Sequence, residues 1–179
     1  KTAGSLNIPG LDPGTSYQIA IYNEDVLRGT KVLKTSGIKG ALIIAVNPGD
    51  DISNLVTNAI AQGRPDVTLL FKGGQIYDLG AVTLPAGLKN ISFTGEKEAL
   101  GEGAVPAVLN LSQVSFSGAS FGKMIFEKVR LVGGTGDFLI NLGADNLNLE
   151  EYDFLGCQME NYKGVVRVQN KAIRLGQIL

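Results

Sequence analysis

The 179-residue sequence contains no histidine, no tryptophan and a single cysteine, and each absence excludes a class of chemistry within this chain. Without histidine there is no Ser-His-Asp triad, no histidine acid–base catalyst and no histidine-ligated metal. One cysteine, Cys157, excludes an internal disulfide and a multi-cysteine zinc site. Because no histidine can activate it, we interpret the Cys157 thiol as a buried structural group rather than a nucleophile.

An excess of charge of either sign is also lacking, since 16 basic residues stand against 17 acidic ones. Nucleic acid or an anionic membrane surface would require a basic face, so neither is expected as a partner. No apolar run approaches the roughly 18 residues that cross a membrane, and no signal peptide is visible. Because the chain begins at Lys1 rather than methionine, it is expected to be a mature or excised piece of a longer protein.

The first 37 residues carry the pattern of a β-hairpin. Gln18–Tyr22 alternates apolar and polar side chains, Asn23–Asp25 is a polar break, and Gly29–Thr35 has the composition of a second strand. We therefore assign residues 1–37 to a hairpin and residues 38–179 to a separate domain.

The residues that lead into this hairpin follow the pattern Leu11-x-Pro13-x-Thr15-x-Tyr17. This pattern resembles the segment before strand F of fibronectin type III modules, where a tyrosine corner pins the sheet. Such a module has roughly 100 residues, so the resemblance implies only its last hairpin. An unrelated hairpin is the alternative.

One segment, near residues 51–62, has the spacing of an amphipathic α-helix. Its apolar residues recur at intervals of three and four, which places them on one face. They are Ile52, Leu55, Val56, Ala59 and Ile60. Asp50 or Asp51 is expected to cap the amino end, and Gly63 to end the helix.

After the helix the chain consists of short β segments that share one pattern: two alternating apolar residues, a polar corner, and two more alternating apolar residues. Aligned by eye, the copies are 86–93, 109–116, 124–131 and 147–154, and a fifth opens at Ile173. The short step between the second and third copies indicates either a tight coil or an alignment displaced by one segment. Ile140–Leu142 and Val166–Val168 form a second repeated strand.

Each copy buries too few side chains to be stable alone, so the copies must stack and join their apolar residues into columns. The absence of helical spacing and of a strict hexapeptide period predicts an all-β, right-handed parallel β-helix over residues 38–179. The helix near 51–62 is expected to cover the open apolar end of its first coil. The last coil is expected to be truncated, so its open end is a candidate surface for self-association.

The same alignment predicts which polar side chains share an outer column. One column contains Lys89, Ser112, Glu127 and Glu150, and it places the carboxylates of Glu127 and Glu150 one strand apart. Such a pair suits a hard cation such as Ca²⁺ or acid–base chemistry. The alternative is a solvated sheet face on which Arg130 pairs with Asp153.

Sugar-binding surfaces commonly use aromatic side chains, and without tryptophan the candidates are tyrosines. Tyr77 and Tyr162 lie near coil turns, and Lys128 and Arg130 supply cations for acidic or hydroxylated groups. We predict these four residues as carbohydrate-binding candidates and assign no catalytic residue.

Two segments carry a resemblance to the pectin-lyase-like superfamily of right-handed parallel β-helices. Val46-x-Pro48-Gly49-Asp50 before the helix, and Leu69 to Tyr77 after it, are similar to the usual start of that fold. The fibronectin-like stub joined to such coils also resembles uncharacterised surface lipoproteins of gut Bacteroidetes, found beside polysaccharide-uptake systems.

The resemblance implies a location outside the cell or on its surface and, in the full-length protein, an anchor in the outer membrane. It implies a non-catalytic module for polysaccharide binding or uptake. The alternatives are the first part of a polysaccharide lyase or glycoside hydrolase whose catalytic coils follow, and a structural spacer or adhesin stalk.

Overall fold

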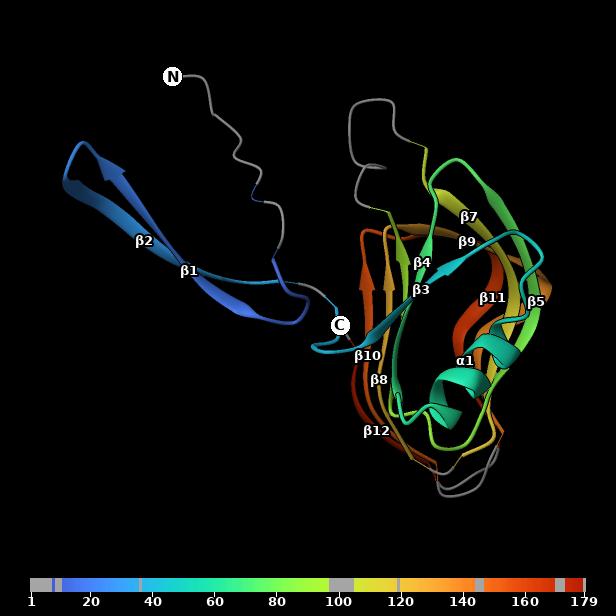
Figure 1. Ribbon diagram of the computed structural model, residues 1–179. Helices are drawn as coiled ribbons and strands as arrows, with labels where there is room; N and C mark the ends of the chain where they lie inside the picture. Colours follow the sequence, from blue (N-terminus) through green and yellow to red (C-terminus); the bar gives the residue numbers. More distant parts are fainter. Residues whose placement is uncertain are drawn as a thin grey trace. The chain divides into compact units, whose positions relative to one another are not determined.

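The computed structural model describes residue 8 and residues 11–35, 37–96, 105–118, 120–143, 147–169 and 173–178, the last of these by backbone alone. These residues fall into two compact units that meet at Gly40 and Ala41. The first contains an antiparallel hairpin of β1 (Ser16–Asn23) and β2 (Val26–Lys34). The second is a parallel β-solenoid, in which one α-helix and the remaining strands lie (Figure 1).

The hairpin is fastened at its base by side chains that bond to backbone. The Asp12 N–H donates to the Tyr17 hydroxyl oxygen at 2.8 Å. The Thr35 hydroxyl donates to the Asp12 carbonyl at 2.5 Å and accepts from the Thr15 N–H at 2.9 Å. The predicted hairpin is present; β1 extends beyond the predicted segment at both ends, and β2 begins three residues earlier and ends one residue earlier than predicted.

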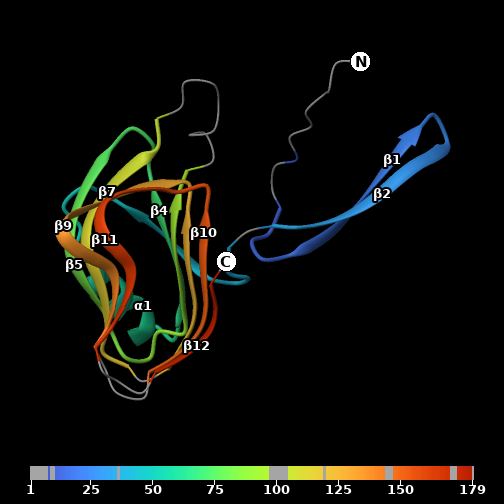
Figure 2. The same cartoon turned by 180° about the vertical axis from the view of Figure 1, so that it is seen from behind.

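Two parallel sheets form the solenoid, and the chain passes from one to the other in every coil (Figures 1 and 2). The six-stranded sheet has the order β12-β10-β8-β6-β4-β3, and the four-stranded sheet the order β11-β9-β7-β5. The elements of the first sheet are β3 (Leu42–Val46), β4 (Asp66–Phe71), β6 (Asn90–Gly95), β8 (Ser120–Glu127), β10 (Leu147–Leu155) and β12 (Ile173–Ile178). Those of the second are β5 (Ile76–Leu84), β7 (Ala107–Phe116), β9 (Val129–Leu142) and β11 (Gln158–Val168).

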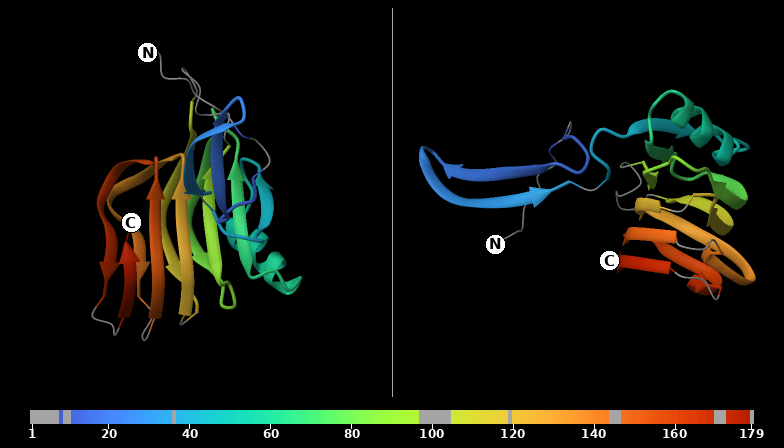
Figure 3. Two further views of the ribbon diagram at one scale, coloured as in Figure 1. Left: turned by 90° about the vertical axis from the view of Figure 1, so that its left-hand side faces the viewer. Right: turned by 90° about the horizontal axis from the view of Figure 1, so that it is seen from below.

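Four successive strand pairs, from β4–β5 to β10–β11, therefore make about four coils, and Figure 3 shows them stacked in chain order. The core runs between the two sheets. Its central feature is a stack of phenylalanine rings that begins with Phe71 and Phe93, whose centroids lie 6.2 Å apart. The Phe93–Phe126 and Phe126–Phe154 distances are 4.9 and 5.4 Å, close to the spacing of neighbouring strands.

The repeated pattern is present in the structure, but the alignment that joined its copies is wrong. Residues 109–116 lie in the four-stranded sheet, whereas 90–93 and 147–154 lie in the six-stranded one. Within the six-stranded sheet Phe93 pairs with Phe126, and Phe126 with Phe154. The third copy was therefore displaced along the chain. The pairing of Ile140 with Val166 and of Leu147 with Ile173 is confirmed.

The cause of this error is that both sheets bend in the same way. At the start of β6 and within β8 and β10, two consecutive outer residues interrupt the inward alternation, at Lys89–Asn90, Gly122–Lys123 and Glu150–Glu151. Strand β7 bends likewise at Ser112–Gln113. A sequence pattern that records only inward and outward positions cannot distinguish the two strands of one coil.

The α-helix α1 (Ile52–Ala61) has the predicted apolar face: Ile52, Val56 and Ala59 are buried in the same core as the sheets. Of the two candidate caps, Asp51 is the N-cap, since its Oδ1 accepts from the Asn54 N–H at 3.1 Å. At the other end Gly63 has a φ of +74°, and the next N–H, from Arg64, donates to the Ala59 carbonyl at 3.0 Å. This pair of features is a Schellman motif. No helix among the described residues has the length and apolarity needed to cross a membrane.

Because Phe126 lies at the centre of the ring stack, its truncation should destabilise the solenoid strongly. Phe126→Ala is expected to lower the free energy of unfolding by about 3–5 kcal/mol in urea denaturation. Ile43→Ala is the control, since Ile43 is 57% exposed, and should change it by less than about 0.5 kcal/mol. Equal effects of the two substitutions would contradict a core centred on the rings.

A second prediction concerns Gly95, where the backbones of two coils approach closely. A Cβ added at Gly95 would lie 2.3 Å from the Lys128 carbonyl oxygen, which is backbone and cannot rotate away. Gly95→Ala should therefore cost about 1–3 kcal/mol of stability. Gly143→Ala is the matched control, because the nearest atom to its added Cβ is 4.0 Å away. A neutral Gly95→Ala would show that the two coils are further apart than described.

Candidate functional site

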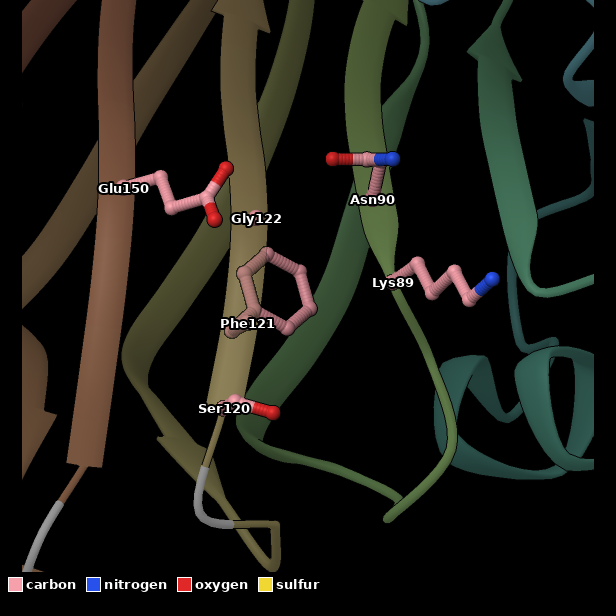
Figure 4. A pocket seen from close by; sticks show the side chains of 6 residues that line it. All are labelled: Lys89, Asn90, Ser120, Phe121, Gly122 and Glu150. Atoms are coloured by element: carbon pink, nitrogen blue, oxygen red, sulfur yellow. The ribbon is translucent and has the colours of Figure 1, made fainter.

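The outer surface of the six-stranded sheet contains a pocket of about 250 Å³ at the bend of its strands. The lining comes from β6, β8 and β10 and from Lys89, which immediately precedes β6. It consists of Lys89, Asn90, Ser120, Phe121, Gly122 and Glu150. Figure 4 shows the side chains of Lys89 and Glu150 on either side of Phe121 and Gly122. We call this feature the Lys89–Glu150 pocket.

The floor of the Lys89–Glu150 pocket depends on glycine at position 122. A Cβ there would meet the Asn90 Oδ1 at 2.5 Å and the Lys89 carbonyl oxygen at 3.1 Å. Without that carbon, the Gly122 N–H donates to the Lys89 carbonyl at 2.8 Å. The Lys123 N–H donates to the Asn90 Oδ1 at 2.7 Å, and the Asn90 Nδ2 donates to the Asp66 Oδ1 at 2.6 Å. Asn90 thereby ties three strands together and holds the floor in place.

A network of charged side chains lies beside the pocket on β8 and β10. The Lys123 Nζ lies 2.5 Å from the Glu151 Oε1 and 3.0 Å from the Asp153 Oδ2. Lys123 and Glu151 are direct partners in the β8–β10 register, so backbone pairing fixes this contact. Asp153 is only 6% exposed, and its Oδ1 has no hydrogen-bond partner among the described residues. Lys123, Glu151 and Asp153 are called the Lys123 network below.

Burial and charge act in opposition on this network. Burial raises the pKa of the Asp153 carboxyl, and the hydrogen bond from Lys123 offsets part of that rise. For Lys123, burial lowers the pKa, but the hydrogen bonds to Glu151 and Asp153 outweigh it, so the pKa is raised. Two carboxylates that share one ammonium group, one of them with a raised pKa, are the elements of acid–base chemistry.

The predicted pairing of Glu127 with Glu150 is wrong. Glu127 pairs in register with Leu155, five positions along β10 from Glu150, so the two carboxylates are not neighbours. Glu127 is 6% exposed and lies 3.3 Å from the Lys128 Nζ. The described residues contain no group of three or more acidic or cysteine side chains arranged to hold a metal ion.

Of the tyrosines predicted to bind sugar, Tyr77 is wrongly assigned because its ring is fully buried. The Tyr77 hydroxyl accepts from the Lys72 N–H at 2.9 Å, and the ring packs edge-on against Phe71 at 5.0 Å. Tyr162 is half-buried, and its hydroxyl donates to the Leu111 carbonyl. Burial raises the pKa of both phenols.

The two predicted cations occupy separate positions. Lys128 forms the corner between β8 and β9 with a φ of +56° and pairs with Glu127. Arg130 donates a bidentate pair of hydrogen bonds to Glu160, with Nε–Oε1 and Nη2–Oε2 distances of 2.8 and 2.7 Å. The alternative pairing of Arg130 with Asp153 is therefore also wrong. Cys157 is half-buried against the core, and burial raises its pKa.

The outer column predicted from the sequence contained both Lys89 and Glu150, and these two residues do line one pocket. On the strand between them the lining includes Gly122, whereas the predicted column placed Ser112 and Glu127 there. The Lys123 network was missed because its strand, β8, was placed out of register. Comparison with protein-family models, with curated proteins and with solved structures yields no match to this chain.

The raised pKa of Asp153 predicts how the stability of the chain depends on pH. The folded chain holds the Asp153 proton more tightly than the unfolded chain, so this group's contribution to stability falls as pH rises through its folded-state pKa. Relative to the parent, Asp153→Asn should therefore be most stable at neutral pH and lose that advantage as pH falls. Urea unfolding over a pH series measures the difference.

Glu160→Gln is the control with the opposite sign. The hydrogen bond from Arg130 lowers the pKa of Glu160, so its contribution is present above the unfolded-state pKa and is lost as pH falls. The parent should therefore exceed Glu160→Gln in stability by more at neutral pH than in acid. Parallel curves for the two variants would refute the assignment of the Asp153 shift.

Proposed function

We propose that this chain is a non-catalytic cell-surface module that binds polysaccharide at the Lys89–Glu150 pocket. The supporting observation is that polar side chains of unlike chemistry line one pocket on the outer surface of the six-stranded sheet. The lining includes the side chains of Lys89, Ser120 and Glu150, whereas Phe121 is 5% exposed and belongs to the core beneath. The three polar side chains offer the donors and acceptors that sugar hydroxyls require, and charged partners strengthen such hydrogen bonds. The pocket crosses three strands, which suits a linear glycan.

The proposal includes the finer features of the fold. We take the solenoid as right-handed and as a member of the pectin-lyase-like superfamily, with α1 covering the apolar end of its first coil. The buried residues Ile52, Val56 and Ala59 support this role for α1. The contact between Tyr17 and Asp12 supports the descent of the hairpin from a fibronectin type III module, in which a tyrosine corner has this form.

A surface location follows from the same resemblance to Bacteroidetes lipoproteins associated with polysaccharide uptake. In this proposal the chain is one portion of a larger protein anchored in the outer membrane. Its ligand is external polysaccharide, and nucleic acid is not a partner.

One observation favours a second function, the first part of a polysaccharide lyase or glycoside hydrolase. The Lys123 network provides two carboxylates and a lysine, the side chains such enzymes use for proton transfer. Release of oligosaccharide by the parent and its loss in Asp153→Asn would support this function over simple binding.

A glycan array probed with the whole 179-residue chain tests the binding proposal. The double variant Lys89→Gln, Glu150→Gln removes two charged partners from the pocket without loss of side-chain size. The double variant should bind any polysaccharide that occupies this pocket roughly tenfold more weakly than the parent does. Lys72→Gln is the control, since Lys72 is exposed on the solenoid outside the pocket, and should bind like the parent.

Two outcomes would contradict the proposal. If the parent binds no polysaccharide, the chain acts as a spacer or stalk. If the parent binds and the double variant binds equally well, the glycan site lies elsewhere on the molecule. Thermal unfolding of each variant confirms that any loss of binding does not reflect loss of the fold.

A further inference from the structure

The outer surface of the four-stranded sheet contains an aromatic ring with two cations beside it. The Phe138 ring centroid lies 6.0 Å from the Lys163 Nζ and 5.7 Å from the Arg167 Cζ. The ring comes from β9 and both cations from β11, the neighbouring strand. Lys163 and Arg167 are exposed, and Phe138 is half-buried. We call these three residues the Phe138 platform.

A glycine creates the space for this ring. Gly164 is the register partner of Phe138, and a Cβ at Gly164 would lie 2.8 Å from the Phe138 Cε1. The ring therefore lies against the bare backbone of β11, where any other residue would push it away. This close fit fixes the position of the ring relative to the two cations.

Neither cation of the Phe138 platform has a carboxylate partner within ion-pair distance in the part of the chain that the structure describes. On the same strand pair Arg130 is neutralised by Glu160, so the platform differs from its surroundings. An exposed cation–π contact contributes about 0.5–1 kcal/mol, and one cation would supply it. The second cation instead doubles the positive charge at one ring.

Amide side chains continue the surface beside Arg167. Arg167 pairs in register with Asn141, whose Nδ2 donates to the Gln113 Oε1 at 3.0 Å. The Gln169 Nε2 donates to the Asn141 Oδ1, also at 3.0 Å. Gln113, Asn141 and Gln169 thus form an amide ladder across three coils. Its outer amide groups keep unused donor and acceptor capacity for a ligand.

We infer that the Phe138 platform and the amide ladder form a binding site for an anionic polysaccharide. The ring offers an apolar face to a sugar ring, Lys163 and Arg167 face carboxylate or sulfate groups, and the amides bond to hydroxyls. This site lies on the opposite sheet from the Lys89–Glu150 pocket. Substitutions in one site therefore test that site separately from the other.

Binding of the whole chain to four probes tests this inference. Heparin represents sulfated polysaccharide, polygalacturonate the carboxylated class, dextran the neutral class, and single-stranded DNA a different polyanion. The parent is expected to bind heparin or polygalacturonate in a salt-dependent manner and to bind dextran at least roughly tenfold more weakly. The polyanion that binds more tightly identifies the acidic group.

The double variant Lys163→Gln, Arg167→Gln should weaken polyanion binding by about tenfold or more. Arg28→Gln, Lys31→Gln loses the same charge from the hairpin and should bind like the parent, which separates the local site from net charge. Phe138→Leu keeps an apolar side chain and should weaken binding about threefold or more while thermal unfolding stays near that of the parent. Lys89→Gln, Glu150→Gln should leave this binding unchanged.

Several results would overturn the inference. The first is that the parent binds neither acidic polysaccharide, and the second is that the Lys163→Gln, Arg167→Gln variant binds as tightly as the parent. The third is that the Arg28→Gln, Lys31→Gln variant loses as much binding as the Lys163→Gln, Arg167→Gln variant. The fourth is that the parent binds DNA more tightly than either polysaccharide. Loss of polyanion binding in the Lys89→Gln, Glu150→Gln variant alone would assign the ligand to the other sheet.

Discussion

Inside the solenoid, the rings of Phe71, Phe93, Phe126 and Phe154 form one stack, and the positions of the outer side chains on β4, β6, β8 and β10 follow from this arrangement. The shortest centroid spacing, 4.9 Å, is close to the roughly 4.8 Å between neighbouring parallel strands, and the other two spacings are 5.4 and 6.2 Å. A slip of one residue in any strand would turn its ring outward and expose its apolar partners. The stack therefore sets the strand register, and the register decides which polar residues meet outside.

In the six-stranded sheet the number of residues per coil varies, whereas the strand pairs show no register shift. The Asp66–Asn90 contact joins residues 24 apart, and the Asn90–Lys123 contact joins residues 33 apart. Outer neighbours such as Lys123 and Glu151 are thus brought together by inner packing, without any fixed spacing in the sequence.

This explains how far the sequence could predict the structure. Alternation identified the strands, the helical stripe identified α1, and the glycine at 63 identified its end, because each of these signals is local. The register was beyond reach wherever both strands of a coil carry the same bend. Phe126 was aligned with the wrong residues for that reason, and Glu127 was brought to Glu150 in error. Lys89 and Glu150 were matched correctly because their two segments do belong to one sheet.

The residue type alone also could not distinguish an inner tyrosine from an outer one. Tyr77 satisfies its hydroxyl with the Lys72 backbone at a coil turn, so a ring suited to sugar stacking serves the core instead. Phe138, in contrast, is an apolar residue that lies half-buried beside two exposed cations.

Glycine is the common cause of both candidate sites. Gly122 lets Asn90 cross the strand and form the floor of the pocket, and Gly164 lets the Phe138 ring lie on bare backbone. Neither glycine has a positive φ, so backbone freedom does not explain its presence. The explanation is the space left by a missing Cβ, a property of the neighbouring coil rather than of the glycine's own segment. On a parallel sheet the side chain that occupies this space comes from a distant part of the sequence. A solenoid therefore builds its outer sites from residue pairs that only the stacked structure reveals.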